Sequence, residues 1–131
     1  MHEEYDKTLK DFYSPYAERL FANEVFRKQL LSCPYVEREA HATDRKFFAK
    51  VLDSYLDEAK LTLSLLHGVD IKKTDALLEV GGGLGLVYGF LKKHGYDISG
   101  IEPCDLAHQG FFAAAVELCN VIGVNAFIAR R

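Results

Sequence analysis

The residue types best suited to chemistry lie between Glu79 and Gly85. This stretch, Glu-Val-Gly-Gly-Gly-Leu-Gly, follows a short apolar run and precedes a helical pattern, so we expect it to join a strand to a helix. Glycines in such a loop permit a tight turn with positive φ and let a ligand lie against bare main chain. The helix that follows offers free N–H groups to that ligand. The stretch therefore predicts a ligand-binding loop, with a plain tight turn as the structural alternative.

Two common phosphate-binding patterns do not fit this loop. The sixth position of a dinucleotide-binding G-x-G-x-x-G pattern is Leu86 or Tyr88, depending on the starting glycine, and no Gly-Lys-Ser/Thr follows as a P-loop requires. What fits is an acid-x-Gly-x-Gly-x-Gly pattern that starts at Glu79. A carboxylate at Glu79 would repel a pyrophosphate and favour a ligand that carries an amine or another positive centre.

A second acid closes the next predicted strand. Glu102 ends the run Asp97–Glu102, 23 residues after Glu79, and Pro103 stops that strand. An acid at this place can accept hydrogen bonds from both hydroxyls of a ribose. One nucleoside, one positive centre and no phosphate together describe S-adenosylmethionine.

Residues 76–129 resemble the first half of a class I S-adenosylmethionine-dependent methyltransferase. The stretch ALLEVGGGLGLVYGFLKKHGYDISGIEP is similar to the first two motifs of that family. The resemblance implies that the alternating glycines line the methionine portion of the cofactor, that Glu79 holds its amino end, directly or through water, and that Glu102 binds the ribose. It also implies an in-line attack of a substrate N, O, C or S atom on the sulfonium methyl, which requires no metal. The cofactor-binding residues expected are Glu79, Gly81, Gly82, Gly83, Leu84, Gly85, Glu102 and Pro103.

The pattern after residue 75 alternates between strand and helix. We expect an α/β fold: a Rossmann-like half-core whose parallel strands lie in the order 3-2-1, because right-handed crossovers place successive strands to one side of the first. The apolar run that forms the first strand is typical of a buried strand. The expected strands are 76–81, 97–102 and 125–129, and the expected helices are 84–94 and 107–122.

The segment before this core is predicted to be helical, since only one of the chain's 10 glycines, Gly68, precedes residue 76. We divide the chain into a helical N-terminal cap, residues 1–70, and a partial S-adenosylmethionine-binding core, residues 71–131. One cap helix starts with Ser14 as N-cap and Pro15 in its first turn and runs to about Leu31. The next carries an apolar stripe from Phe47 to Leu66, with Thr43 as a plausible N-cap and Gly68 as a left-handed C-terminal residue.

The resemblance also implies what this chain lacks. A complete family core has seven strands, ordered 3-2-1-4-5-7-6, and this sequence ends after the third, so we expect an N-terminal fragment that is inactive by itself. No catalytic base can be assigned; Tyr13, Tyr16, Tyr35, His41 and His108 are candidates by residue type only. Without a fourth strand, strand 76–81 would have an open, apolar edge, which favours a homodimer unless the N-terminal helices cover it.

Composition excludes several other classes. The formal net charge is −3, which gives no basic excess for nucleic-acid binding. No apolar run approaches the ~20 residues of a membrane span, and the acidic N-terminus is unlike a secretory signal. The 3 cysteines show no Cys-x-x-Cys spacing, which predicts a cytoplasmic protein without a metal site. The acceptor substrate cannot be read from the sequence.

Two other functions stay open at this point. One is a non-catalytic module that keeps the cofactor-binding fold for assembly or regulation. The other is an NAD-dependent oxidoreductase with an irregular glycine loop, although the missing sixth glycine and the acid at Glu79 count against it.

Overall fold

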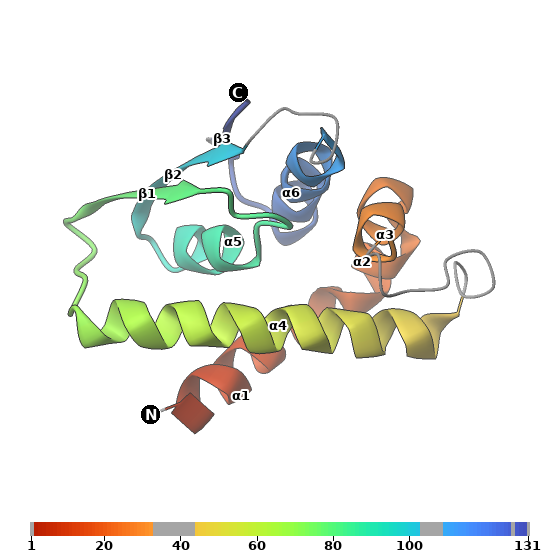
Figure 1. Ribbon diagram of the computed structural model, residues 1–131, viewed down its shortest axis with the longest axis horizontal. Coiled ribbons are helices and arrows are strands. Elements are labelled where there is room, and N and C mark those ends of the chain that lie inside the picture. Colours follow the sequence, from red (N-terminus) through yellow and green to blue (C-terminus); the bar gives the residue numbers. More distant parts are fainter. Residues whose placement is uncertain (1, 33–43, 103–108, 127, 131) are drawn as a thin grey trace.

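The structure, a computed structural model, describes residues 2–32, 44–102, 109–126 and 128–130 (Figure 1). Helices dominate the first half, and strands alternate with helices in the second. The elements are α1 (His2–Tyr13), the 3-10 helix η1 (Ser14–Tyr16), α2 (Ala17–Ala22), α3 (Glu24–Leu30), α4 (Arg45–Gly68), β1 (Ala76–Val80), α5 (Leu86–Lys93), β2 (Asp97–Glu102), α6 (Gln109–Ile122) and β3 (Ile128–Arg130).

The single helix predicted from Ser14 to Leu31 is wrong. Ser14 and Pro15 instead form η1, which follows α1 directly, and Ser14 caps no helix. Asn23 then separates α2 from α3, because its backbone is extended (φ −77°, ψ 109°) and its side chain accepts a hydrogen bond from the N–H of Phe26 at 3.0 Å. A capping side chain thus divides a segment whose apolar pattern alone suggested one helix.

The long helix α4 is amphipathic, as its sequence predicted. Asp44 caps its N-terminus by accepting hydrogen bonds from two backbone N–H groups, whereas the predicted cap, Thr43, lies outside the described residues. Gly68 is the last helical residue and does not adopt the left-handed conformation; Asp70 does, with φ of 53°. Buried side chains recur on one face of the helix: Phe48, Leu52, Leu56, Ala59 and Leu63.

The sheet is parallel, so the chain has the mixed α/β fold that the change of pattern predicted. β1 pairs with β2 (Leu77 beside Ile98), and β2 pairs with β3 (Gly100 beside Ile128), in the order β1-β2-β3. Helix α5 lies between the sheet and α4 (Figure 1). Because the two strands are parallel, β1 and β2 end at the same edge of the sheet, and the glycine loop follows β1 there.

The prediction that β1 is buried is wrong for one of its faces. Within the described residues β1 has a neighbouring strand on one side only, and Leu78 and Val80 remain 59% and 70% exposed. Thr62 and Leu66 of α4 line a groove of about 280 Å³ along the unpaired edge of β1. The helix nevertheless leaves Leu78 and Val80 exposed to solvent. The apolar run predicted a strand, while its burial depends on neighbours that the sequence of β1 does not specify.

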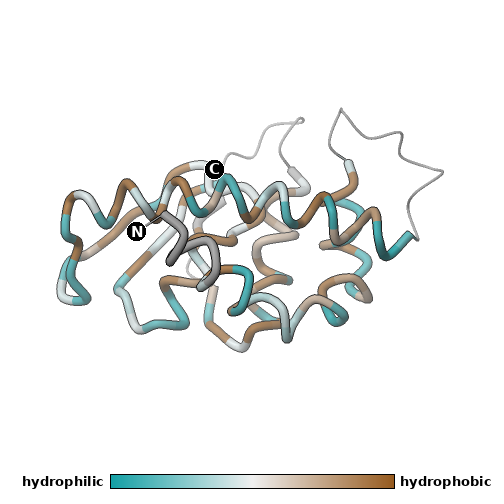
Figure 2. Tube along the Cα trace, turned by 90° about the horizontal axis from the view of Figure 1, so that it is seen from below, coloured by the Kyte–Doolittle hydropathy of each residue, from teal (hydrophilic) through white to brown (hydrophobic). Residues whose placement is uncertain are grey.

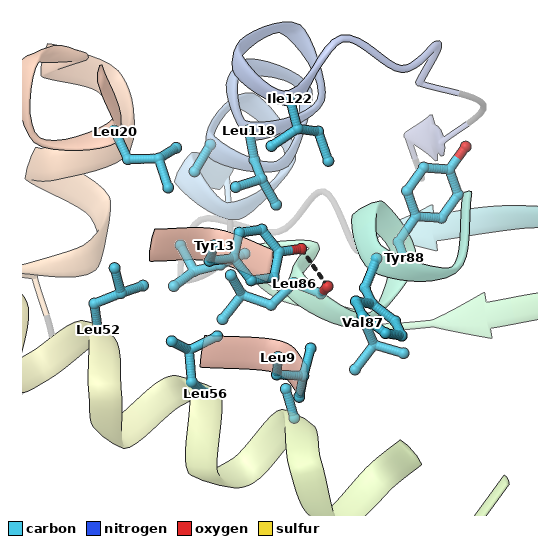
Figure 3. Close-up of a cluster of buried hydrophobic side chains, with 14 of the residues drawn as sticks. Leu9, Tyr13, Leu20, Leu52, Leu56, Leu86, Val87, Tyr88, Leu118 and Ile122 are labelled. Carbon is cyan, nitrogen blue, oxygen red and sulfur yellow. Dashed lines mark hydrogen bonds between the residues drawn. The ribbon is translucent and has the colours of Figure 1, made fainter. Parts of the chain in front are cut away.

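One hydrophobic core joins the N-terminal helices to the α/β part. Leu9, Leu20 and Leu56 belong to the same buried cluster as Leu118 and Ile122 of α6 (Figure 3). The predicted division near residue 70 stays a prediction, but the two segments share this core.

Among the described helices, none is long and apolar enough to cross a bilayer. Hydrophilic and hydrophobic residues alternate along α4 (Figure 2).

Tyr13 fixes α1 against the start of α5. Its side chain is 1% exposed, and its hydroxyl donates a hydrogen bond to the backbone carbonyl of Leu86 (Figure 3). Gly89, one turn along α5, leaves the space that this packing needs, since a Cβ there would lie 3.1 Å from the Tyr13 hydroxyl oxygen and 2.8 Å from Cδ1 of Ile122. The N-terminal helices therefore hold the helix that follows the glycine loop.

Candidate functional site

The glycine loop leaves the carboxyl end of β1 in a conformation that requires glycine. Gly81, Gly83 and Gly85 have φ values of 68°, 61° and 78°, in the region that other residues avoid. Gly82 lies against the Glu79 side chain: a Cβ there would lie 2.1 Å from Oε1 of Glu79, so that flexible carboxylate would have to move. The predicted positive-φ turn is confirmed at Gly81, Gly83 and Gly85.

The loop exposes its backbone at two of these glycines. A Cβ at Gly81 would meet no atom within 4 Å, and one at Gly83 would meet only Cδ1 of Phe111, at 4.0 Å. Gly85 differs, because it is buried, caps α5 and would place a Cβ 3.0 Å from that of Ala115. Positions 81 and 83 thus present bare main chain to a ligand, whereas Gly85 serves helix packing.

Glu102 is tied to the loop. Its side chain is one of the most buried polar groups described, at 4% exposed, and its Oε2 accepts a hydrogen bond from the backbone N–H of Gly83 at 3.2 Å. The register of the parallel pair, with Glu79 beside Gly100, puts Glu79 and Glu102 on the same face of the sheet, because residues two apart along a strand share a face. The two predicted acids therefore lie on one face of neighbouring strand ends.

The two carboxylates interact unfavourably. Burial raises the pKa of Glu79, and the charge of Glu102 raises the pKa further. Both effects disfavour a negative charge on Glu79, and the attraction of a cation bound beside the two acids would offset them. The electrostatics of the site therefore favour a positively charged ligand group.

A cavity of about 420 Å³ opens over the loop. Its walls come from four places: the loop with the end of β1, the first turn of α5 (Leu86 and Val87), the middle of α4, and Phe111 of α6. Glu79 lines it, and Leu84, 3% exposed, contributes to its wall while anchoring the loop in the core. The volume lies at the low end of the ~300–1,000 Å³ typical of small-molecule sites.

Most of the predicted cofactor-binding residues come together around this loop. Glu79 and the stretch from Gly81 to Leu84 line the cavity. Glu102 contacts the loop from β2 and, with Gly85, lines a separate pocket of about 10 Å³. Pro103 lies outside the described residues. Which ligand these residues bind stays a prediction.

Neither of the two candidate catalytic bases that the structure describes lies at the cavity. Tyr13 is held in the core by the hydrogen bond to Leu86, and burial raises its pKa well above the usual range, so it is poorly suited to accept a proton. Tyr16 packs against Phe12, with ring centroids 5.9 Å apart, and does not line the cavity. The other three candidates, Tyr35, His41 and His108, lie outside the described residues.

Sequence reasoning missed the wall that α4 supplies. Tyr55, Glu58 and Thr62 line the cavity opposite the glycine loop. Tyr55 had been assigned to the apolar stripe of the helix, and the other two had no assigned role. Their spacing of three and four residues, which places them on one face of a helix, was a readable signal. That this face meets the loop is a tertiary relationship that no local pattern contains.

The other reactive side chains described do not form a site. Among the described residues, no group of three or more His, Cys, Asp or Glu side chains could hold a metal ion. Cys119 is buried, and burial raises the pKa of its thiol to about 11, which leaves little reactive thiolate at neutral pH.

The chain was compared with protein-family models, with curated proteins and with solved structures, and nothing in any of the three matches it.

Proposed function

We propose that the chain binds S-adenosylmethionine in the cavity over the glycine loop, as part of a methyltransferase, and that β1 to β3 with α5 and α6 form a Rossmann-like half-core. The observation that carries the proposal is the arrangement of two acids around one glycine loop. Glu79 precedes the loop, and Glu102 reaches it from the neighbouring strand. Parallel strands commonly place ligand-binding loops at their carboxyl ends.

The residues present fit this cofactor. At Gly81 and Gly83 the space that a Cβ would fill is open, so the methionine portion can lie directly on the main chain. The charge of Glu79 suits the amino group of the ligand, and Glu102 has the acceptor oxygens that ribose hydroxyls need. When bound, S-adenosylmethionine supplies an electrophilic methyl group; the chain's own residues bind and orient it.

The same features argue against a nicotinamide dinucleotide. A pyrophosphate placed on the loop would lie beside two carboxylates, and no lysine, arginine or histidine is found among the described residues that line the cavity. A buried or half-buried anion without a cationic partner is costly. The proposal therefore favours S-adenosylmethionine over NAD.

Isothermal titration calorimetry of the 131-residue chain tests the proposal. S-adenosylmethionine and its demethylated product, S-adenosylhomocysteine, should bind, and NAD should not. Binding of neither adenosyl ligand, or tighter binding of NAD, would contradict the proposal. Binding without methyl transfer to any acceptor tested would favour a non-catalytic module with the same site.

A further inference from the structure

The wall of the cavity that α4 supplies combines a carboxylate with an aromatic ring and a hydroxyl group. Tyr55, Glu58 and Thr62 project from one face of the helix toward the loop, and Phe111 of α6 completes the enclosure. Glu58 is exposed, so its carboxylate stays in contact with solvent. The cavity thus has a second carboxylate, on the wall opposite Glu79.

The charged residues of this cavity have one sign. Glu58 and Glu79 are acidic, and no lysine, arginine or histidine occurs among its described lining residues. Concave sites lined by one sign of charge concentrate the field and attract ions of the opposite sign. An anion in this cavity would meet two negative walls, while a cation would be attracted by both.

Two aromatic rings in the cavity wall can also attract a cation, and the strength of this attraction depends on the kind of cation. Tyr55 and Phe111 are both half-buried and line the cavity. Ring faces attract cations, and alkylated ammonium groups gain most because they lose little hydration on leaving water. A small inorganic ion would need several oxygen ligands in a regular shell, which two separated carboxylates do not provide.

We propose that the α4 wall makes this cavity a binding site for an organic ammonium group, held between Glu58, Glu79 and the rings of Tyr55 and Phe111. The ligand class is an alkylated or primary ammonium compound of a few heavy atoms. The site shares Glu79 and the loop with the proposed cofactor site and adds a wall that the cofactor motifs do not include. The ammonium compound is expected to bind when no S-adenosylmethionine is present.

A matched pair of ligands isolates the charge. Choline and 3,3-dimethylbutan-1-ol have nearly the same shape, but only choline is charged. Titrations of the 131-residue chain, followed by the backbone amide resonances of Gly81, Gly83 and Phe111, should show choline binding at least fivefold more tightly than the neutral alcohol. Equal affinities, or no choline-dependent shifts at these amides, would overturn the proposal.

A matched pair of variants isolates the wall. Glu58→Gln should weaken choline binding about three- to fivefold, since the lost charge acts across a solvated cavity. Asp53→Asn removes the same charge from α4 at an exposed residue that lines a different cavity, and should leave the affinity within twofold. If the two variants behave alike, the α4 wall does not recognise the cation. Choline binding does not depend on the adenosyl ligands, so this result and the calorimetric test above can fail separately.

Discussion

The carboxylate of Glu102, at the end of β2, accepts a hydrogen bond from the backbone N–H of Gly83 in the loop that follows β1. This bond joins two parallel strand ends through a residue that has no side chain. It holds the loop toward Glu102, so the acid predicted to bind the ribose also supports the backbone predicted to hold the methionine portion. The two roles can be separated by substitution.

Glu102→Ala should lower the affinity for S-adenosylhomocysteine about 10- to 100-fold, because it removes charge-assisted hydrogen bonds worth roughly 1.5–3 kcal/mol. Glu102→Gln keeps an oxygen that can accept the Gly83 N–H bond but lacks the charge, so we expect a smaller loss, near tenfold. Calorimetry on both variants checks this. Unchanged affinity in Glu102→Ala would remove the acid from the site.

Gly83→Val should abolish binding, since a branched side chain would occupy the open space beside the loop and would strain a backbone with φ of 61°. Gly68→Ala is the control: Gly68 ends α4 without a positive φ, and its Cβ would meet no atom within 4 Å. That variant should bind normally and gain about 0.5–1 kcal/mol of stability, because alanine favours helix over glycine. If Gly83→Val folds and binds like the native chain, the loop is only a turn.

Glu79 makes the protein without ligand less stable at neutral pH. Burial and Glu102 raise the pKa of Glu79 in the folded state, so the folded protein binds this proton more tightly than the unfolded chain does. Proton binding therefore stabilises the folded state at low pH, and this stabilisation is lost as the pH rises from 4.5 through the raised pKa. Glu79→Gln should therefore raise the unfolding midpoint at pH 7 by about 2–5 °C, while weakening adenosyl-ligand binding. Thermal unfolding followed by circular dichroism at pH 7 and pH 4 checks the sign. If Glu79→Gln raised the unfolding midpoint more at pH 4 than at pH 7, this account would be contradicted.

The open edge of β1 predicts self-association. Leu78 and Val80 are exposed beside backbone groups with no neighbouring strand among the described residues, and such edges tend to pair with other chains. The native chain should show a mass that rises with concentration in size exclusion coupled to light scattering. Leu78→Lys, which places a charge on the edge, should stay monomeric. A constant monomer mass for the native chain would refute self-association.

Local patterns predicted the parts of the fold that depend on neighbouring residues in the chain. Asp97–Glu102 is a strand with the predicted bounds, and the alternating glycines adopt positive φ as expected. The break at Asn23 was missed because capping there competes with an apolar pattern that continues past it. The exposure of β1 and the position of Glu58 across the cavity from the glycine loop depend on tertiary packing, so neither could be predicted from local sequence.

The location of the bound adenosyl ligand tests the central claim most directly. In a two-dimensional ¹⁵N–¹H titration with S-adenosylhomocysteine, we expect the largest shifts at the amides of Gly81, Gly82 and Gly83, with smaller shifts at Glu102. The resonances of α2 (Ala17–Ala22) should change little, because none of its residues lines the cavity. Shifts confined to residues outside the loop, or no shifts at ligand concentrations up to millimolar, would contradict the claim that this glycine loop is an S-adenosylmethionine site.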